Sequence, residues 1–223
     1  MGVAAGLLLA AALYVLGMQF GLLFVISMVL FLVLSALATR AGAKRKMALK
    51  LFEKSRGIRN VAANGMGPLV MAIIFYSAYA RGMGFLAMLS VIGFMGSVAA
   101  IASDKFASEI GVLGAEPRML LTLRKVRKGV SGGVSLLGLG ASFAAALIIA
   151  LLVLPYLPAM GALSDGIAPA AAFASVLLGG FFGNIIDSAL GYYEDKGIGN
   201  KFSTNFVCSI SGAVLAMLLY MAL

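Results

Sequence analysis

The sequence predicts an all-α polytopic membrane protein, a bundle of six or seven transmembrane helices in a single domain over residues 1–223. The composition is the first reason: 62% of the residues are hydrophobic and 11% charged, whereas soluble domains are nearer half apolar and a quarter charged. The second reason is that the apolar residues form long runs, and about 20 such residues cross a bilayer. The expected surroundings are therefore a lipid bilayer.

The predicted spans follow one another with short polar connections. The first apolar region, residues 2–38, has a soft break at residues 17–19, which favours two short spans and leaves one long tilted helix as the alternative. The segment from Met1 to Leu16 has no basic start of the kind a signal peptide carries, so we expect a membrane helix there. Further spans are expected at 61–80, 84–103, 135–157, 167–187 and 204–222.

Basic residues alternate along the chain in a way that predicts its orientation. Except for Arg81, all Lys and Arg residues fall in every second connection, at 39–60, 103–132 and 188–203. The positive-inside rule assigns such connections to the cytoplasm. We therefore expect a multi-pass protein of the cell membrane with its active site facing the cytoplasm. The net charge of +9 then reflects topology and anionic headgroups, and no nucleic-acid partner is expected.

Acidic residues mark the cytoplasmic ends of two predicted spans, where Asp104 and Asp187 lie. Ionisable groups at membrane depth are costly and usually functional, although a solvated helix end is the simpler interpretation. Positions four apart share a helix face, so Asp104 lies above Ala100 and Gly96, and Asp187 lies above Gly183. Small residues let another helix approach closely, so the two aspartates are expected near helix contacts.

The chain has no histidine and one cysteine, Cys208, which restricts its chemistry. These absences remove the commonest general base, the Ser-His and Cys-His nucleophiles, an intramolecular disulfide and a multi-cysteine metal site. Any enzymatic site would instead use a hard cation held by oxygen, such as Mg²⁺. Asp104 and Asp187 are the candidate ligands, with Glu109 as a third. If the helix continues, however, Glu109 lies on another face and pairs more naturally with Lys105.

The stretch LRKVRKGVSGGVSLLG, residues 123–138, has features of a phosphate-binding loop. Its glycines would let backbone N–H groups turn toward an anion, and its lysines would neutralise phosphate charge. These residues are Gly129, Gly132, Gly133, Lys125 and Lys128. No GxxxxGK[ST] or GxGxxG is present, so neither the P-loop nor the dinucleotide-binding arrangement is supported. A flexible connector is an equally good interpretation.

Two asparagines, Asn64 and Asn205, lie just inside predicted spans near the same surface. A lone asparagine in a span more often bonds a neighbouring helix than a ligand. Their position at the depth of the aspartates makes them weaker site candidates.

Five motifs together resemble a known family. RNVAANG, ASDKFASEIG, KVRKGVSGGVSLLG, GFFGNIIDSALG and NFVCSISGA occur in the order and spacing of the integral-membrane family called domain of unknown function 92. That family includes animal transmembrane protein 19 and the plant phytyl-phosphate kinases. The resemblance covers about residues 30–220 and implies a multi-helix enzyme. Its activity would be transfer of a phosphoryl group from a nucleoside triphosphate, typically CTP, to an isoprenoid monophosphate.

The resemblance also implies roles for individual residues. The catalytic positions would be Asp104, Glu109, Lys125 and Asp187, and all of these except Lys125 would also bind Mg²⁺. The nucleotide- and phosphate-binding positions would be Gly129, Gly132, Gly133, Ser135, Asn64, Asn205, Ser108 and Ser188, to which the charge of the loop itself adds Lys128. The chain departs from the family pattern at Lys105, Arg127, Val130 and Ser131.

An isoprenoid-phosphate kinase competes with two other interpretations, a transporter and a non-catalytic lipid-binding membrane protein. A transporter places its polar cluster near the bilayer midplane, whereas the acids here cluster at one surface. A phosphate monoester has a second pKa of about 6 and is already an anionic nucleophile, which suits a chain without histidine. The sequence leaves open the length and saturation of the isoprenoid and the oligomeric state, and a homo-oligomer is compatible with it.

Overall fold

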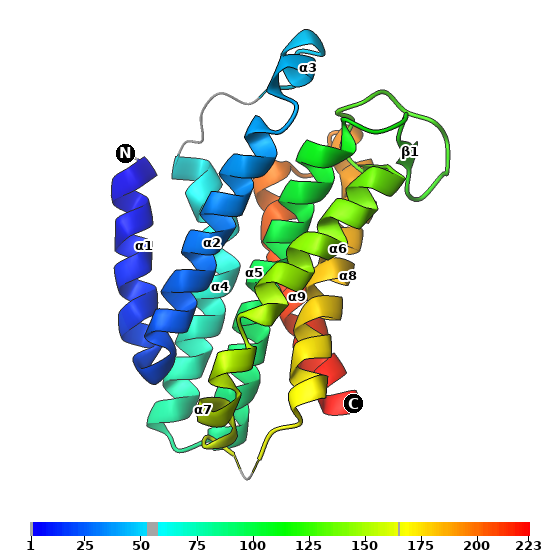
Figure 1. The fold of residues 1–223 in the computed structure, drawn as a ribbon. Helices are drawn as coiled ribbons and strands as arrows, with labels where there is room; N and C mark the ends of the chain where they lie inside the picture. Colours follow the sequence, from blue (N-terminus) through cyan, green and yellow to red (C-terminus); the bar gives the residue numbers. More distant parts are fainter. Residues whose placement is uncertain (1, 53–57, 165) are drawn as a thin grey trace.

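The computed structural model describes residues 2–52, 58–164 and 166–223, and these form a bundle of long helices (Figure 1). In chain order the helices are α1 (Gly2–Leu16), α2 (Gly21–Arg40), α3 (Ala43–Ala48), α4 (Ile58–Ala80), α5 (Gly84–Gly111), α6 (Leu136–Leu151), α7 (Leu157–Gly161), α8 (Pro169–Asp195) and α9 (Lys201–Ala222). Two short strands, β1 (Arg118–Met119) and β2 (Gly133–Val134), pair antiparallel between α5 and α6. The predicted polytopic helix bundle is confirmed.

Six helical segments among the described residues are long and apolar enough to cross a membrane. They are Met18–Arg40, Val61–Ala80, Gly84–Gly111, Leu136–Gly161, Pro169–Glu194 and Lys201–Ala222. Helix α1 is also apolar, but its 15 residues extend only about 22 Å, less than the hydrocarbon core of about 30 Å.

The first apolar region forms two helices rather than one long tilted helix. One turn of 3-10 helix, Met18–Phe20, separates α1 from α2, and the two helices pack side by side (Figure 1). Gly21 explains the reversal, because a Cβ there would collide with the carbonyl oxygen of Tyr14. The predicted break at residues 17–19 is therefore confirmed.

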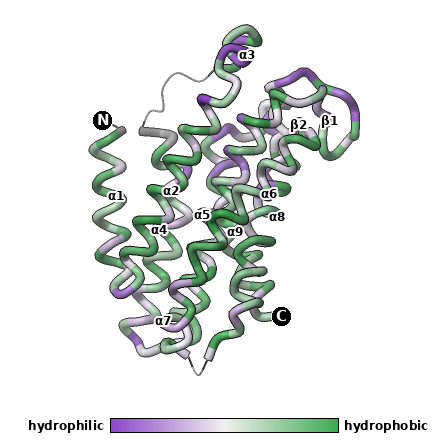
Figure 2. Tube along the Cα trace, in the orientation of Figure 1, coloured by the Kyte–Doolittle hydropathy of each residue, from purple (hydrophilic) through white to green (hydrophobic). Residues whose placement is uncertain are grey.

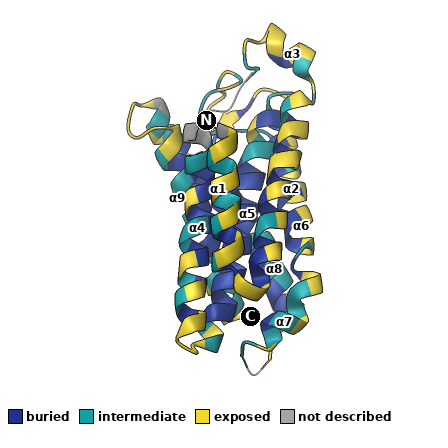
Figure 3. Cartoon of the chain, turned by 90° about the vertical axis from the view of Figure 1, so that its left-hand side faces the viewer, coloured by how far each residue is buried: buried dark blue, intermediate teal, exposed yellow. Residues whose placement is uncertain are grey.

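Helix α5 runs through the middle of the bundle and is the most buried of the spans (Figure 3). It packs against α2, α4, α6, α8 and α9. On the side of α2 and α4 the contacts are aromatic: the rings of Phe24 and Phe94 stack with centroids 3.8 Å apart, and Phe75 meets Phe24 edge to face at 5.8 Å. On the side of α9 the contacting residues are small, as where Gly96 meets Ala216 and Gly212, and Cys208 is fully buried there.

The C-terminal ends of three helices differ from the predicted spans. Helix α5 continues to Gly111 rather than ending near residue 103, and α8 continues to Asp195 rather than ending near residue 187. Both extensions amount to about two turns. They were missed because hydropathy marks where a chain becomes polar, not where its helical hydrogen bonds stop. Helix α6 is shorter than predicted and ends at Leu151, since Pro155 follows and cannot continue it.

Hydrophilic residues gather at one end of the bundle (Figure 2). Helix α3, the β1–β2 connection and the start of α9 lie at this end, opposite α7 and the C-terminus (Figure 1). The predicted basic segments meet here, although Lys54 and Arg56 lie outside the described residues. The assignment of this end to the cytoplasm stays a prediction.

Candidate functional site

Glycines bring α5, α8 and α9 into close contact just below the polar end. A Cβ on Gly183 of α8 would lie 2.8 Å from the Cβ of Ala100 in α5 and 2.9 Å from the Cα of Gly212 in α9. Side chains do not approach so closely, so this helix contact requires glycine. Asp104 follows Ala100 by one turn, and Asp187 follows Gly183 by one turn. The same contact therefore brings the two carboxylates together.

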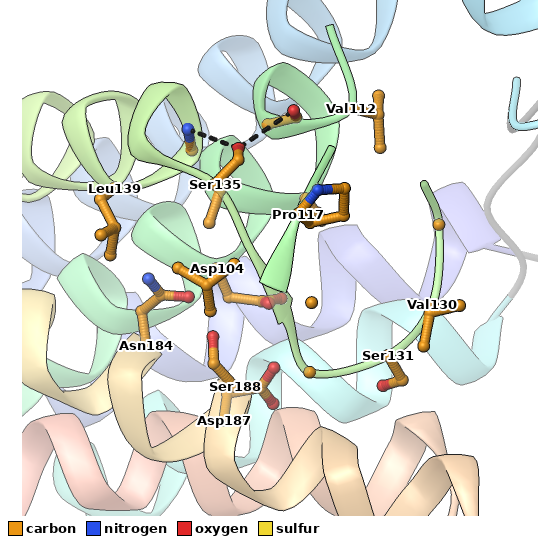
Figure 4. Close-up of a pocket in the computed structure, with 18 of the residues that line it drawn as sticks. Asp104, Val112, Pro117, Val130, Ser131, Ser135, Leu139, Asn184, Asp187 and Ser188 are labelled. Carbon is orange, nitrogen blue, oxygen red and sulfur yellow. Dashed lines mark hydrogen bonds between the residues drawn. The ribbon is translucent and has the colours of Figure 1, made fainter. Parts of the chain in front are cut away.

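A pocket of about 240 Å³ opens above this contact (Figure 4). Its walls come from α5, the connection between α5 and α6, α6 itself, α8 and α9. Among the predicted site residues it brings together Asp104, Ser108, Gly129, Gly132, Gly133, Ser135, Asp187 and Ser188. The predicted residues that do not line it are Asn64, Glu109, Lys125, Lys128 and Asn205.

Lys201 joins the two aspartates across the pocket. Its Nζ lies 3.8 Å from Oδ1 of Asp104 and 3.6 Å from Oδ2 of Asp187. Both aspartates are buried, whereas the Lys201 side chain is 54% exposed. Lys201 is the first residue of α9, and Asn200 fixes that start by accepting hydrogen bonds from two backbone N–H groups of the first turn. The site thus contains two buried carboxylates and a cation that reaches solvent.

The glycine-rich stretch forms a folded wall of the pocket. Gly129 and Gly132 have φ values of +88° and +79°, in the left-handed region that favours glycine. Gly132 also packs on α8, because a Cβ there would lie 2.7 Å from the backbone N of Tyr192 and 2.8 Å from the carbonyl oxygen of Ser188. Ser135 caps α6 and donates a hydrogen bond to the last carbonyl of α5 at 3.1 Å (Figure 4). This stretch is therefore held in place on two sides and is not a loose connector.

Glu109 belongs to a separate buried cluster of charges. Its Oε2 accepts a hydrogen bond from Lys46 at 2.7 Å, and its Oε1 accepts from Lys105 and Thr39, each at 2.8 Å. Lys46 is fully buried and also donates to the carbonyl oxygens of Ala38 and Thr39 at the end of α2. The predicted pairing of Glu109 with Lys105 is confirmed. Since both carboxylate oxygens face cations outside the pocket, the expected third carboxylate does not join the two aspartates.

The two predicted phosphate-binding lysines lie outside the pocket. Lys125 faces Glu116 at 3.6 Å with both side chains 68% exposed, and Lys128 donates to the carbonyl oxygen of Gly114. The cation beside the aspartates is Lys201 instead. Sequence reasoning missed it because Lys201 was grouped with the basic connection before the last span. Only the start of α9 at residue 201, rather than at 204, puts it above the pocket.

The amides separate into two kinds. Asn205 donates through Nδ2 to Oδ1 of Asn64 at 3.4 Å, which joins α9 to α4 as the interhelical interpretation expected. Asn184 lines the pocket with 1% of its surface exposed, and neither polar atom of its amide has a hydrogen-bond partner in the described part of the chain. Sequence reasoning also missed Asn184, although its place three residues before Asp187 puts both on one helix face.

The donor set of the pocket suits a hard cation. Asp104 and Asp187 provide carboxylate oxygens, and Oδ1 of Asp187 is buried without a hydrogen-bond partner among the described residues. Over residues 2–52, 58–164 and 166–223, no three His, Cys, Asp or Glu side chains gather into a metal site. Mg²⁺ is usually bound by one or two carboxylates together with water and substrate phosphates. Two carboxylates are too few to complete the coordination of such an ion, so water or other oxygen ligands would have to join Asp104 and Asp187.

Fold and site together define an integral membrane protein with a polar, carboxylate-containing pocket at one end of its helix bundle. The chain belongs to the family described as integral membrane protein DUF92, which it matches over residues 1–219. The family resemblance of its motifs is thereby confirmed.

Three proteins illustrate the range of its relatives. The chain is 32% identical over 205 residues to an uncharacterized membrane protein of Methanocaldococcus jannaschii, MJ0933, covering 91% of this chain and 79% of that protein. It is 36% identical over 106 residues to Protein PGR of Arabidopsis thaliana, covering 44% and 35% of the two chains. It is 35% identical over 115 residues to an uncharacterized membrane protein of Synechocystis, sll0875, covering 51% and 44%. No solved structure matches the chain.

Proposed function

We propose that the protein is a Mg²⁺-dependent kinase that converts an isoprenoid monophosphate, such as phytyl or geranylgeranyl phosphate, into the diphosphate. The phosphoryl donor is a nucleoside triphosphate, with CTP favoured by the family resemblance. The observation that carries the proposal is the pair of buried aspartates, bridged by Lys201, in a pocket walled by the glycine-rich stretch. This polar pocket adjoins the apolar helices, so a soluble donor and a lipid acceptor can meet there.

The reaction requires positioning and charge stabilisation rather than a strong base. An oxygen of the acceptor monophosphate attacks the γ-phosphorus of the donor and forms the new P–O bond. The bond from that phosphorus to the β,γ-bridging oxygen breaks, and the nucleoside diphosphate leaves with the electron pair. Because the acceptor is already an anion near neutral pH, a chain without histidine is suited to this step.

The residues of the pocket would have different roles in the transfer, according to their positions. Asp104 and Asp187 would hold the magnesium ion, which would supply positive charge to stabilise the phosphates during transfer. Lys201, on the open side, would stabilise negative charge on the transferring group. The backbone around Gly132 and the hydroxyl group of Ser188 line the same cavity and would contact phosphate oxygens.

The position of the pocket favours this function over transport. A transporter holds its substrate near the bilayer midplane, between repeats. The pocket here is lined by the connection between α5 and α6 and by Lys201 at the start of α9. Both lie at the end of the bundle where hydrophilic residues gather (Figure 2). We propose that this end faces the cytoplasm of a cell-membrane protein, where nucleotides are available.

The direct test uses purified protein in detergent with Mg²⁺, γ-labelled CTP or ATP, and geranylgeranyl or phytyl monophosphate. We expect label in the lipid diphosphate, faster transfer from CTP than from ATP, loss of transfer with a chelator and its recovery with added Mg²⁺. If folded protein transfers no label to any lipid phosphate, the proposal is wrong. Binding of the lipid phosphate without transfer would instead support the non-catalytic lipid-binding alternative.

A further inference from the structure

Asn184 has a buried side-chain amide that makes no hydrogen bond to any of the described residues. Its side chain is 1% exposed and lines the pocket, yet neither Nδ2 nor Oδ1 has a hydrogen-bond partner there. An unpaired buried polar group destabilises a protein, so such groups usually have a ligand or another role. Figure 4 shows Asn184, Asp104 and Asp187 extending toward the same cavity.

The depth of Asn184 indicates which ligand it meets. Helix α8 runs toward the polar end of the bundle, so Asn184 lies about one turn deeper than Asp187, nearer the apolar interior (Figure 1). Leu139 of α6 lines the cavity beside it (Figure 4). One turn further inward, the rings of Phe143 in α6 and Phe181 in α8 meet at 5.6 Å. Asn184 therefore stands at the boundary between the polar cavity and apolar surface.

A nucleotide and a lipid phosphate must approach this boundary from opposite sides. The glycine-rich stretch and Lys201 lie on the outer side of the aspartates, where a soluble triphosphate arrives. A lipid phosphate keeps its chain among apolar residues, so its headgroup reaches the cavity from the side of Leu139 and Asn184. An amide NH₂ group there can donate a hydrogen bond to a phosphate oxygen without placing another charge near the apolar interior.

We propose that Asn184 binds the phosphate of the lipid acceptor by donating from Nδ2 to one of its oxygens, with the isoprenoid chain leaving past Leu139 between α6 and α8. This inference rests on the proposed function and specifies its acceptor site. It makes Asn184 the residue that holds the attacking phosphate beside the two aspartates.

Two substitutions test the donated hydrogen bond. Asn184→Leu has a similar shape and no polar atoms, whereas Asn184→Asp keeps the shape but replaces the donor with a carboxyl group that repels a phosphate when it is ionised. Asn184→Leu should raise the KM for geranylgeranyl monophosphate about ten- to a hundred-fold, the effect of one hydrogen bond to a charged group, and Asn184→Asp should raise it at least as much. The KM for CTP should change less than about threefold, since the nucleotide binds on the outer side. The Tm of Asn184→Leu should not fall, because an unpaired buried group is removed.

Ser175→Ala is the matched control. Ser175 lies deeper in the same helix, is fully buried and also has no hydrogen-bond partner among the described residues, but it does not line the pocket. Its replacement should leave both KM values unchanged. If Asn184→Leu or Asn184→Asp binds the acceptor as tightly as the unchanged protein, the inference is wrong. If Asn184→Leu does not fold, the affinity of Asn184→Asp for the acceptor is the test of the inference.

Calorimetric titration with geranylgeranyl monophosphate, without nucleotide, separates this inference from the proposed function. If the unchanged protein binds this lipid and both Asn184 variants bind it more weakly, while the labelling assay with nucleotide shows no phosphoryl transfer, the acceptor site is supported and the kinase activity is contradicted. Transfer that persists with an unchanged acceptor KM in the variants would contradict the acceptor site alone. If the unchanged protein binds no lipid phosphate, both proposals fail.

Discussion

Replacing Lys46 with methionine removes an ammonium group that makes three hydrogen bonds in a buried cluster. Its Nζ donates to Glu109 at 2.7 Å, to the carbonyl oxygen of Ala38 at 2.7 Å and to that of Thr39 at 3.1 Å. Breaking a buried ion pair costs about 3–5 kcal/mol when the remaining charge is left alone. Here Glu109 keeps Lys105 and Thr39, while the two carbonyls lose a donor worth about 1 kcal/mol each. With about 2 kcal/mol from the two carbonyls and about 1 kcal/mol from the lost part of the ion pair, we expect Lys46→Met to lower the free energy of unfolding by about 3 kcal/mol.

The assay is reversible unfolding in mixed detergent and dodecyl sulfate micelles, combined with a double-mutant cycle. Glu109→Gln should also destabilise the protein, and the double variant should lose less than the sum of the single losses by at least about 1 kcal/mol. Lys44→Met, an exposed position on the same helix, is the control and should change stability little. A loss below about 1 kcal/mol for Lys46→Met, or additive single effects, would refute the assignment of Glu109 to this cluster.

Two further predictions concern the pocket itself. Lys201→Met should lower kcat about a hundred-fold or more, because it removes the cation beside the transferring group, whereas Lys125→Met should lower it less than about threefold. If steady-state assays show a larger loss of kcat in Lys125→Met than in Lys201→Met, Lys125 rather than Lys201 stabilises the transferring group. Gly132→Ala should destabilise the protein by at least about 2 kcal/mol, since it combines a left-handed φ with a clash against α8. Gly82→Ala is its control in unfolding measurements, because Gly82 shares the positive φ but has open space around it; equal losses in both variants would contradict the packing of Gly132 on α8.

The helix bundle could be predicted because the bilayer imposes strong constraints on a sequence. Span length follows from bilayer thickness, and the break at residues 17–19 follows from the interrupted apolar run. Helical periodicity was enough to put Asp104 above Ala100 and Asp187 above Gly183, and the close contact of those glycine and alanine residues was therefore foreseeable. These features depend on local spacing, which the sequence displays directly.

The composition of the site was less predictable, because it depends on where helices end and how they rotate. Lys201 reaches the aspartates only because α9 begins at that residue. Glu109 is five residues beyond Asp104, about 140° around a continuous helix, and so it faces α2 and α3 instead of the pocket. Lys125 depends on the course of an irregular connection, for which neither hydropathy nor periodicity gives a position.

We propose that Asp104 and Asp187 support phosphoryl transfer to a lipid phosphate. The most direct test of this role is a single-turnover measurement with γ-labelled CTP, Mg²⁺ and phytyl monophosphate, followed by separation of the lipid products. The unchanged protein should place the label on the terminal phosphate of the lipid diphosphate. Asp104→Asn and Asp187→Asn, with Tm values showing that they remain folded, should each transfer at least about a thousand-fold more slowly. Transfer at the unchanged rate in both variants, or no transfer by the unchanged protein while it binds CTP and Mg²⁺, would contradict the claim.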